Sequence, residues 1–208
     1  MGDERMPHEL LIATRNMGKV REVQSLLGAL SLRLRSLAEF PETSEVEETG
    51  ATFAENAAIK ARAYAAQTGC WTLADDSGLE VEALNGAPGV YSARYGGPEA
   101  TDAERIELLL EALSRSGDAS RRARFVCVIA VADHSSNLLE LFTGTCEGRI
   151  AHEARGTGGF GYDPVFVPTG YEQSFGELPP EVKQQISHRA RALQAALPFL
   201  LKHFGTQA

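Results

Sequence analysis

Cysteine is scarce in this chain, and its three cysteines, Cys70, Cys127 and Cys146, lie far apart in the sequence. Their spacing matches neither the paired ligands of a zinc site nor the framework of a small disulfide-stabilised protein. We therefore expect three reduced cysteines in the core. The chain has 208 residues, of which 43% are hydrophobic, so it can build one large domain or two lobes around a shared sheet.

Long hydrophobic runs are also missing. No stretch approaches the roughly 20 apolar residues that a membrane-spanning helix needs. Residues 1–9 are charged and lack the apolar core of a signal peptide. We therefore expect a cytoplasmic protein, with residues 1–9 as an N-terminal extension and residues 10–208 as a single domain.

Positive charge is in deficit, because 28 acidic residues face 20 lysines and arginines and the formal net charge is -8. Nucleic-acid binding depends largely on the neutralisation of phosphates, so this balance argues against a nucleic-acid partner. A small anion needs only a few local cations. Lys19, Lys183 and Arg189 are the candidates for such a site.

Hydrophobic periodicity predicts strands that alternate with helices. Predicted strands cover residues 10–13, 32–37, 71–74, 79–84, 124–132 and 138–146, and an apolar run covers 165–167. Four helices are predicted: one after residue 19 with Leu30 on its apolar face, one over 52–67, one that begins after Thr101 and ends near Gly117, and one capped by Ser187 and bent or ended by Pro198. Residues 133–137 join two strands in a hairpin, so the sheet cannot be all-parallel. The pattern indicates a mixed α/β architecture with two lobes and no linker.

Asp75, Asp76, Ser77 and Gly78 follow the apolar run 71–74 directly, so that two carboxylates are placed where a strand is expected to stop. Buried carboxylates are costly unless they are paired or bind a metal. The alternative is a strand-ending turn, which Asp, Ser and Gly favour for local reasons. If the chain stays extended, Asp75 and Asp76 point to opposite faces and cannot both face one cleft. One of them should then act in the reaction and the other support it.

Residues 14–19, between a strand and a helix, combine a hydroxyl, an amide and a lysine. The free amides and the positive end of a helix N-terminus favour bound phosphate. The segment lacks the glycine pattern of a Walker loop, and its alternative role is an ordinary solvated helix start. The candidate ligands are Thr14, Arg15, Asn16, Met17, Gly18 and Lys19.

Magnesium prefers oxygen ligands and commonly joins one or two carboxylates to substrate phosphates. Glu47 and Asp76 are the candidate metal ligands. Four glutamates lie between residues 42 and 48, and the alternative for any of them is a solvated acidic loop.

Phe160 and Tyr162 flank Gly161 and precede Asp163 in a glycine-rich loop. Aromatic rings can stack on a base, although core packing is an equally good explanation. Further along, Ser187 precedes His188 and Arg189, and an arginine fork can donate twice to neighbouring acceptors such as those of a 6-oxo purine. His134, His152 and His203 are expected on the surface.

These segments, in this order and spacing, resemble the inosine/xanthosine triphosphate pyrophosphatase family from residue 10 to residue 201. The matching segments are TRNMGK (14–19), EETGATFAENAAIKAR (47–62), DDSGL (75–79), GAPGVYSARY (86–95), GGFGYDPVF (158–166) and ISHR (186–189). The resemblance implies a long mixed central sheet flanked by helices, a cleft between two lobes, a homodimer, and magnesium-dependent hydrolysis of non-standard purine triphosphates to monophosphate and pyrophosphate.

The resemblance also implies roles for single residues. Asp76 is the implied proton acceptor and, with Glu47, a magnesium ligand. The implied substrate-binding residues are residues 14–19, Ser77, Phe160, Gly161, Tyr162, Asp163, Lys183, His188 and Arg189. Two rival functions stay open, a related pyrophosphatase for modified pyrimidine nucleotides and a nucleotide sensor without hydrolysis.

Overall fold

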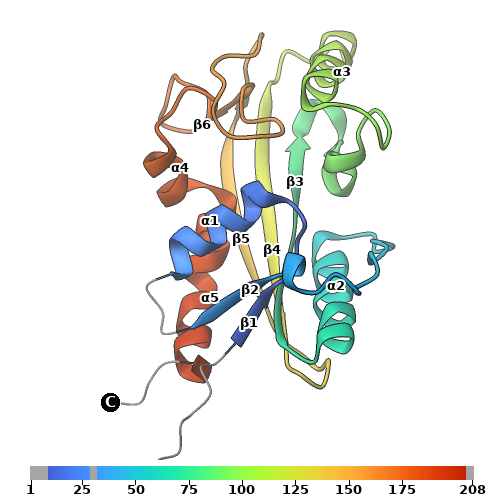
Figure 1. The fold of residues 1–208 in the computed structure, drawn as a ribbon. Coiled ribbons are helices and arrows are strands. Elements are labelled where there is room, and N and C mark those ends of the chain that lie inside the picture. Colours follow the sequence, from blue (N-terminus) through green and yellow to red (C-terminus); the bar gives the residue numbers. More distant parts are fainter. Residues whose placement is uncertain (1–8, 29–31, 205–208) are drawn as a thin grey trace, which may run out of the picture. The chain divides into compact units, whose positions relative to one another are not determined.

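The computed structural model describes residues 9–28 and 32–204. Its strands and helices are labelled in Figure 1. The strands are β1 (Glu9–Ile12), β2 (Arg33–Ser36), β3 (Trp71–Val81), β4 (Arg122–Ala132), β5 (Leu138–Ile150) and β6 (Phe166–Pro168). The α-helices are α1 (Met17–Leu27), α2 (Phe53–Thr68), α3 (Asp102–Arg115), α4 (Pro180–Ile186) and α5 (His188–Phe204). Three short 3₁₀-helices are η1 (Leu37–Glu39), η2 (Glu82–Leu84) and η3 (Gly89–Arg94).

The six strands form a sheet in the order β2-β1-β3-β4-β5-β6. β1 is parallel to both β2 and β3, whereas β5 and β6 are antiparallel. β4 and β5 are neighbours joined by the predicted turn, in which the amide of Asp133 donates to the carbonyl of Asn137. The predicted mixed α/β sheet with flanking helices is confirmed.

The prediction that the strand stops at Asp75 is wrong. β3 runs without interruption from Trp71 to Val81, and residues 82–84 form η2 instead of extending a second strand. A turn is not needed because both carboxylates are buried beside lysines, as described below. Asp75 is 4% exposed and Asp76 is 5% exposed.

The helices largely follow the prediction. The side chains of Thr52 and Thr101 form capping boxes at α2 and α3, and the Ser187 hydroxyl accepts a hydrogen bond from the Ala190 amide at the start of α5. α5 continues through Pro198 to Phe204, so the proline does not end it. Helix α4 was not predicted, and Leu30 lies outside the described residues.

The chain divides into two compact units, each built from separate stretches of the sequence. Unit 1 contains the chain up to Asp76, Val128–Phe142 and the residues from Ala192 onward. Unit 2 contains Ser77–Cys127 and Thr143–Arg191. The chain passes from one unit to the other within β3, β4, β5 and α5.

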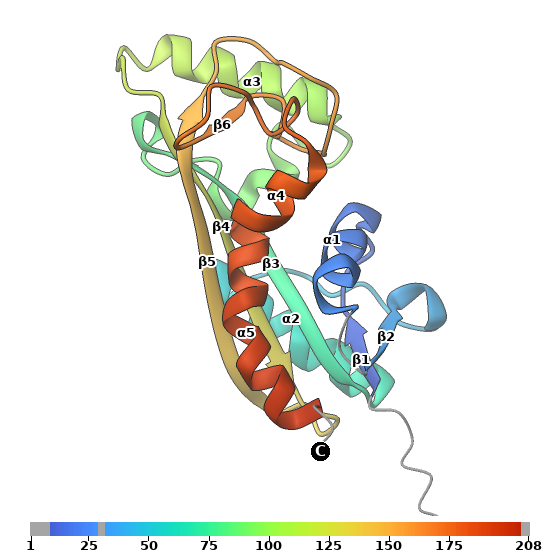
Figure 2. The ribbon, with the colours of Figure 1, turned by 90° about the vertical axis from the view of Figure 1, so that its left-hand side faces the viewer.

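The core of unit 1 is formed around β1, whose Leu10, Leu11 and Ile12 are at most 1% exposed. The second half of α5 covers strands of the same unit (Figure 2). Its Phe204 ring meets Trp71 of β3 edge-on at 4.9 Å.

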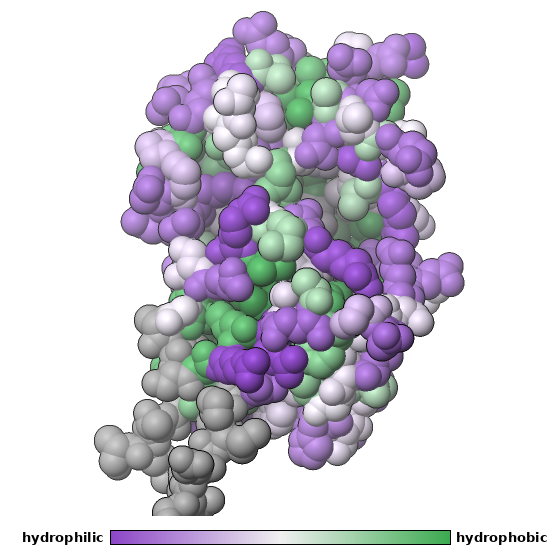
Figure 3. Space-filling view, viewed as in Figure 1, coloured by the Kyte–Doolittle hydropathy of each residue, from purple (hydrophilic) through white to green (hydrophobic). Residues whose placement is uncertain are grey.

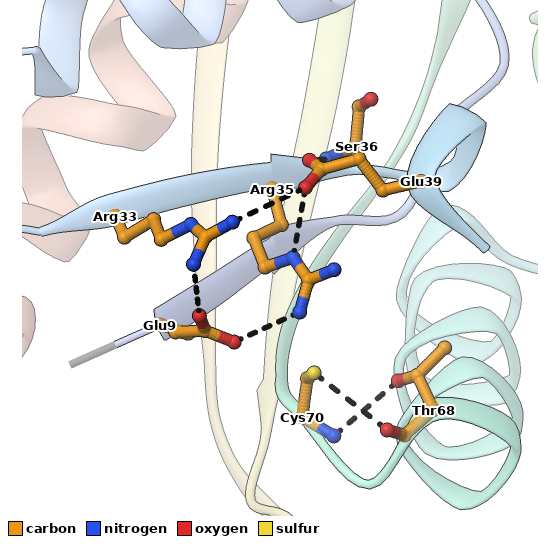
Figure 4. Close-up of polar contacts among 7 residues, drawn as sticks. All are labelled: Glu9, Arg33, Arg35, Ser36, Glu39, Thr68 and Cys70. Atoms are coloured by element: carbon orange, nitrogen blue, oxygen red, sulfur yellow. Dashed lines mark hydrogen bonds and ion pairs between the residues drawn. The ribbon is translucent and has the colours of Figure 1, made fainter. Parts of the chain in front are cut away.

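β2 is an edge strand of the sheet formed by the described residues, and charged side chains lie along it (Figure 4). Glu9 of β1 pairs with Arg33 at 3.0 Å and with Arg35 at 3.0 Å, and Arg35 also pairs with Glu39 at 3.0 Å. Charged side chains on an edge discourage pairing with another chain.

The core of unit 2 is rich in aromatic side chains. Phe125 of β4 lies 4.5 Å from Phe166 of β6, measured between ring centres, and Phe166 lies 5.4 Å from Phe175. The apolar face of α3 belongs to the same cluster through Ile106, Leu109 and Leu113.

Hydrophilic residues dominate the face of the molecule in Figure 3, with smaller hydrophobic areas among them. Among the described residues, the large hydrophobic side chains that are most exposed lie on different elements: Met17, Tyr91, Leu108, Leu141 and Leu201. Within residues 9–28 and 32–204, none of the helices has the length and apolarity to cross a membrane.

Candidate active site

Unit 1 contains a buried cluster of carboxylates and lysines. Lys60 of α2 places its Nζ atom 2.6 Å from Oε1 of Glu48 and 3.6 Å from Oδ1 of Asp76. Lys19 of α1 places its Nζ atom 2.9 Å from Oδ2 of Asp75. Each of the two adjacent carboxylates of β3 therefore lies within 4 Å of a lysine ammonium from a helix of the same unit.

Burial raises the pKa of the Asp76 carboxyl, and nearby Glu48 raises it further. Lys60, Lys19 and the amide of Asn56 lower it, but the net direction is upward. Burial lowers the pKa of Lys60, yet Asp75, Asp76 and Glu48 together raise it above its ordinary value. A carboxylate with a raised pKa is a better proton acceptor near neutral pH than an ordinary aspartate.

The carboxylates of this cluster fit a magnesium ion. Within the described part of the chain, Oδ2 of Asp76 is buried and has no hydrogen-bond partner. Glu48, whose Oε1 atom lies 2.6 Å from the Lys60 ammonium, supplies a second carboxylate. No group of three or more His, Cys, Asp or Glu residues is placed to hold a metal among the described residues. Magnesium bound through one or two carboxylates together with substrate phosphates does not need such a group.

Segment 14–19 forms a capped helix start. The side-chain oxygen of Asn16 accepts hydrogen bonds from the amides of Gly18 at 2.8 Å and Lys19 at 3.2 Å. These two helix amides are therefore already occupied. Donors toward a phosphate can come from the side-chain nitrogen of Asn16, from the Thr14 hydroxyl, which accepts from the Asn16 backbone amide at 3.2 Å, and from the Lys19 ammonium, which also pairs with Asp75.

Two other residues of this segment have different surroundings. Arg15 donates to the backbone oxygen of Thr43 at 3.0 Å, so it ties the loop to the segment after η1. Met17 is 56% exposed.

Glu47, the glutamate predicted as a metal ligand, is exposed. The neighbouring Glu48 is the member of the acidic segment that the structure brings to Lys60. The structure therefore pairs Lys60 with Glu48 and not with Glu47, and the role of Glu47 as a metal ligand stays a prediction.

Asn56, like Lys60 and Glu48, is a polar residue that the prediction missed. Its side-chain oxygen accepts from the Gly50 amide at 2.7 Å, and the residue is fully buried. The Asn56 side chain lowers the pKa of the Asp76 carboxyl. Asn56 and Lys60 lie four residues apart on the buried face of α2, among Phe53, Ala57, Ala61 and Tyr64. Polar residues within a hydrophobic stripe were the signal that could have revealed them.

Unit 2 contains a second polar cluster. Oδ2 of Asp163 accepts from Lys183 Nζ at 2.6 Å and from the Phe160 amide at 2.8 Å. The Lys183 ammonium lies 4.5 Å from the centre of the Phe160 ring, and the Arg189 guanidinium carbon lies 5.9 Å from it. Cations over an aromatic face are attracted by its negative charge distribution.

The two aromatic residues of the glycine-rich loop differ in their surroundings. Phe160 is half-buried, which leaves it as the ring for stacking. Tyr162 is 4% exposed, and its hydroxyl donates to the Ser92 carbonyl at 3.0 Å, which favours core packing, while its role in substrate binding stays a prediction. Burial also raises the pKa of the Tyr162 hydroxyl. Its ring packs in the core, the alternative already recognised from the sequence.

The segment that begins α5 is buried as well. Arg189 is 1% exposed and donates from its NH2 nitrogen to the Ser77 hydroxyl at 2.9 Å. His188 stacks on Phe125 with 4.6 Å between ring centres and 12° between planes. Phe125 supports His188, and no sequence motif singles it out.

The fold and these clusters define a class of protein, an α/β protein with buried clusters of cationic and acidic side chains suited to an anionic ligand. The chain belongs to the Ham1 family, whose model matches residues 10–199. It is 47% identical over 197 residues to the dITP/XTP pyrophosphatase of Coxiella burnetii, covering 94% of this chain and 98% of that protein. It is 48% identical over 189 residues to the dITP/XTP pyrophosphatase of a Nostoc species, covering 91% and 92%.

Solved structures agree with this assignment. The structure of a HAM1 protein from Coxiella burnetii matches with a TM-score of 0.86 and 47% identity, and covers 94% of this chain and 99% of that one.

Proposed function

We propose that this protein hydrolyses non-standard purine nucleoside triphosphates to the monophosphate and pyrophosphate, and so removes them from the nucleotide pool. The substrates are the triphosphates of inosine and xanthosine, with ribose or deoxyribose. The observation that carries the proposal is the buried Asp76 carboxylate, which is flanked by Lys60 and has a free oxygen within the described part of the chain. The activity for which the related dITP/XTP pyrophosphatases are named supports the substrate class.

The cluster in unit 1 acts on the phosphates. Lys19 and Lys60 neutralise the charge that develops on the departing pyrophosphate, and Thr14 and Asn16 orient the phosphate chain. Asp76 accepts the proton of the water that attacks the α-phosphorus, because its raised pKa suits a general base. The bond from the α-phosphorus to the bridging oxygen breaks, and pyrophosphate leaves.

The carboxylates of Asp76 and of Glu48 or Glu47 would hold magnesium, which would supply positive charge at the substrate phosphates. The chain's own lysines and carboxylates position the reactants for that step.

The cluster in unit 2 recognises the base. Phe160 offers a ring for stacking, while Ser77, His188 and Arg189 supply polar groups. A 6-oxo purine presents an acceptor where adenine presents an amino donor, so an arginine donor disfavours adenine. One good bidentate contact discriminates bases by about 1–3 kcal/mol. Guanine shares the 6-oxo group, so its exclusion needs a pocket that disfavours the 2-amino group.

We further propose that the protein is a cytoplasmic homodimer without a nucleic-acid or membrane partner. The net charge of -8 supports the absence of a nucleic-acid partner. Sedimentation of the purified protein tests the dimer.

A substrate panel tests the proposal. Inosine, xanthosine, adenosine and guanosine triphosphates are each incubated with enzyme and magnesium, and pyrophosphate and orthophosphate are measured separately. We expect pyrophosphate from the first two substrates at rates well above those of the last two. Equal rates for all four would refute the base preference, and orthophosphate as the first product would move the attack to the terminal phosphorus. Asp76→Asn serves as the inactive control.

A further inference from the structure

Asp102, the first residue of helix α3, accepts a hydrogen bond from the loop of residues 160–163. The Gly161 amide donates to Oδ2 of Asp102 at 2.7 Å, across 59 residues of sequence. The other carboxylate oxygen of Asp102 accepts from Arg105 at 3.0 Å. The two oxygens of one carboxylate therefore serve two purposes, one within α3 and one toward the loop.

Three hydrogen bonds hold the loop of residues 160–163 in place. Asp163 accepts from the Phe160 amide, Asp102 accepts from the Gly161 amide, and the Tyr162 hydroxyl donates to Ser92. The first contact lies within the loop, and the Tyr162 contact is made by a side chain buried in the core. Asp102 holds the backbone directly between Phe160 and Tyr162.

The backbone at Gly161 makes this point sensitive. Its φ of +60° lies in the left-handed region, which lets the chain reverse between the half-buried Phe160 and the buried Tyr162. A charge-assisted hydrogen bond to the amide at such a residue restrains the direction in which the Phe160 ring points.

We propose that Asp102 is a positioning residue for base recognition, which anchors the loop that carries Phe160 through the Gly161 amide. This inference rests on the proposed function, in which Phe160 stacks on the base. Asp102 touches neither the base nor the reacting phosphates. Its effect passes through the loop alone, and binding of the base is the step that it changes.

Kinetic variants separate this role from a general effect on α3. Asp102→Ala removes the acceptor, whereas Asp102→Asn keeps a side-chain oxygen for Gly161 and removes the charge that faces Arg105 and the helix N-terminus. With inosine triphosphate, we expect Asp102→Ala to raise KM about three- to tenfold, the effect of one lost charge-assisted hydrogen bond, with kcat within twofold of wild type. We expect Asp102→Asn to stay within twofold of wild type in both constants. The inhibition constant of inorganic pyrophosphate, which has no base, should be unchanged in all variants.

A second readout does not depend on the enzyme's activity. Hydrogen–deuterium exchange of peptides that cover residues 156–163 should be faster in Asp102→Ala than in wild type or Asp102→Asn. If thermal melting shows that Asp102→Ala does not fold, Asp102→Ser replaces it, because serine is accepted at helix starts and is too short to reach Gly161.

The outcomes distinguish the two proposals. Wild-type protein that hydrolyses none of the four triphosphates refutes the proposed function, while the exchange experiment still decides whether Asp102 anchors the loop. An active wild type with unchanged KM and unchanged exchange in Asp102→Ala overturns the anchor. Equal impairment of Asp102→Asn and Asp102→Ala also overturns it, because the carboxylate charge would then act through α3 instead.

Discussion

The Lys60 ammonium lies 3.6 Å from Oδ1 of Asp76, and its nearest carboxylate, that of Glu48, lies at 2.6 Å on another segment of the chain. One cation thus holds together the residue proposed as the base and the acidic segment before α2. Lys60 lowers the pKa of Asp76 while burial raises it. The lysine therefore offsets part of the effect of burial on the pKa of Asp76.

Lys60→Met tests this relationship. The variant keeps a chain of similar length but leaves Glu48 and Asp76 without their shared cation. We expect kcat to fall by about 10²–10³, the effect of removing one preorganised donor at a reacting centre. Loss of the charged hydrogen bond to Glu48 should lower the free energy of unfolding by about 1.5–3 kcal/mol.

Pyrophosphate release and urea denaturation measure these two changes. Lys202→Met on the exposed end of α5 is the matched control, and its stability should stay within about 0.5 kcal/mol of wild type. A Lys60→Met variant that keeps half of the wild-type turnover would show that Lys60 has no part in the reaction.

Asp76→Asn should separate activity from stability. Because burial raises the pKa of Asp76 above its ordinary value, the folded chain retains a proton that the unfolded chain releases in the interval between the two values. The stability of the wild type therefore falls as pH rises through this interval, and the loss persists above it. Asparagine does not titrate, so the Asp76→Asn variant does not lose stability as the pH rises through this interval. We expect Asp76→Asn to lose turnover 10²–10⁴-fold, as for a removed general base, and to melt at a higher temperature than wild type at pH 7.

Melting curves between pH 8 and pH 4.5, recorded with a chelator, measure the difference. The advantage of Asp76→Asn should shrink toward low pH. An advantage that grows as the pH falls would mean that the folded state lowers the pKa of this carboxyl.

Much of the fold followed from local signals. The capping boxes at Thr52 and Thr101 place the starts of α2 and α3. In each box, a threonine and the glutamate three residues later accept hydrogen bonds from backbone amides that the helix leaves free. Residues 75–78 misled the prediction because Asp, Ser and Gly favour turns when only neighbours are considered. Their lysine partners, Lys19 and Lys60, are remote in sequence, and only the folded chain shows that a continuous strand is possible there.

The candidate site was predicted least well where a residue's role depends on its direction. Sequence cannot tell which of Glu47 and Glu48 turns toward Lys60, since they are chemically identical neighbours. Likewise Phe160 and Tyr162 are alike in pattern, but Tyr162 finds a buried acceptor at Ser92, 70 residues away. The resemblance to a family supplied the positions, and the structure supplied the side chains' surroundings.

The cysteines should differ in reactivity, which tests the packing of both units. Cys127 and Cys146 are buried, whereas Cys70 is half-buried just before β3, where its Sγ lies 3.7 Å from the Thr68 carbonyl oxygen (Figure 4). Burial raises the pKa of Cys146 to about 11, which lowers its thiolate fraction at pH 8 about a hundredfold relative to a thiol at the ordinary value of 9.0. A thiol reagent should therefore modify Cys70 quickly in the folded protein, and all three cysteines in urea.

Cys70→Ser is the control for this assignment, because it should remove the fast reaction and leave the other two thiols slow. A fast reaction that persists in Cys70→Ser would show that β4 or β5 opens readily.

Two glycines with left-handed backbones allow a test of the loop that leads to Phe160. Gly156 has a φ of +75° and Gly170 has a φ of +90°. A methyl group at Gly156 would overlap the backbone of Gly176, whereas at Gly170 it would meet nothing within 4 Å. Gly170→Ala should therefore cost about 1 kcal/mol of backbone strain, and Gly156→Ala should cost about 1–3 kcal/mol more because of the overlap. Urea denaturation of both variants measures the difference, and equal losses would show that residues 156 and 176 do not approach each other as closely as the structure places them.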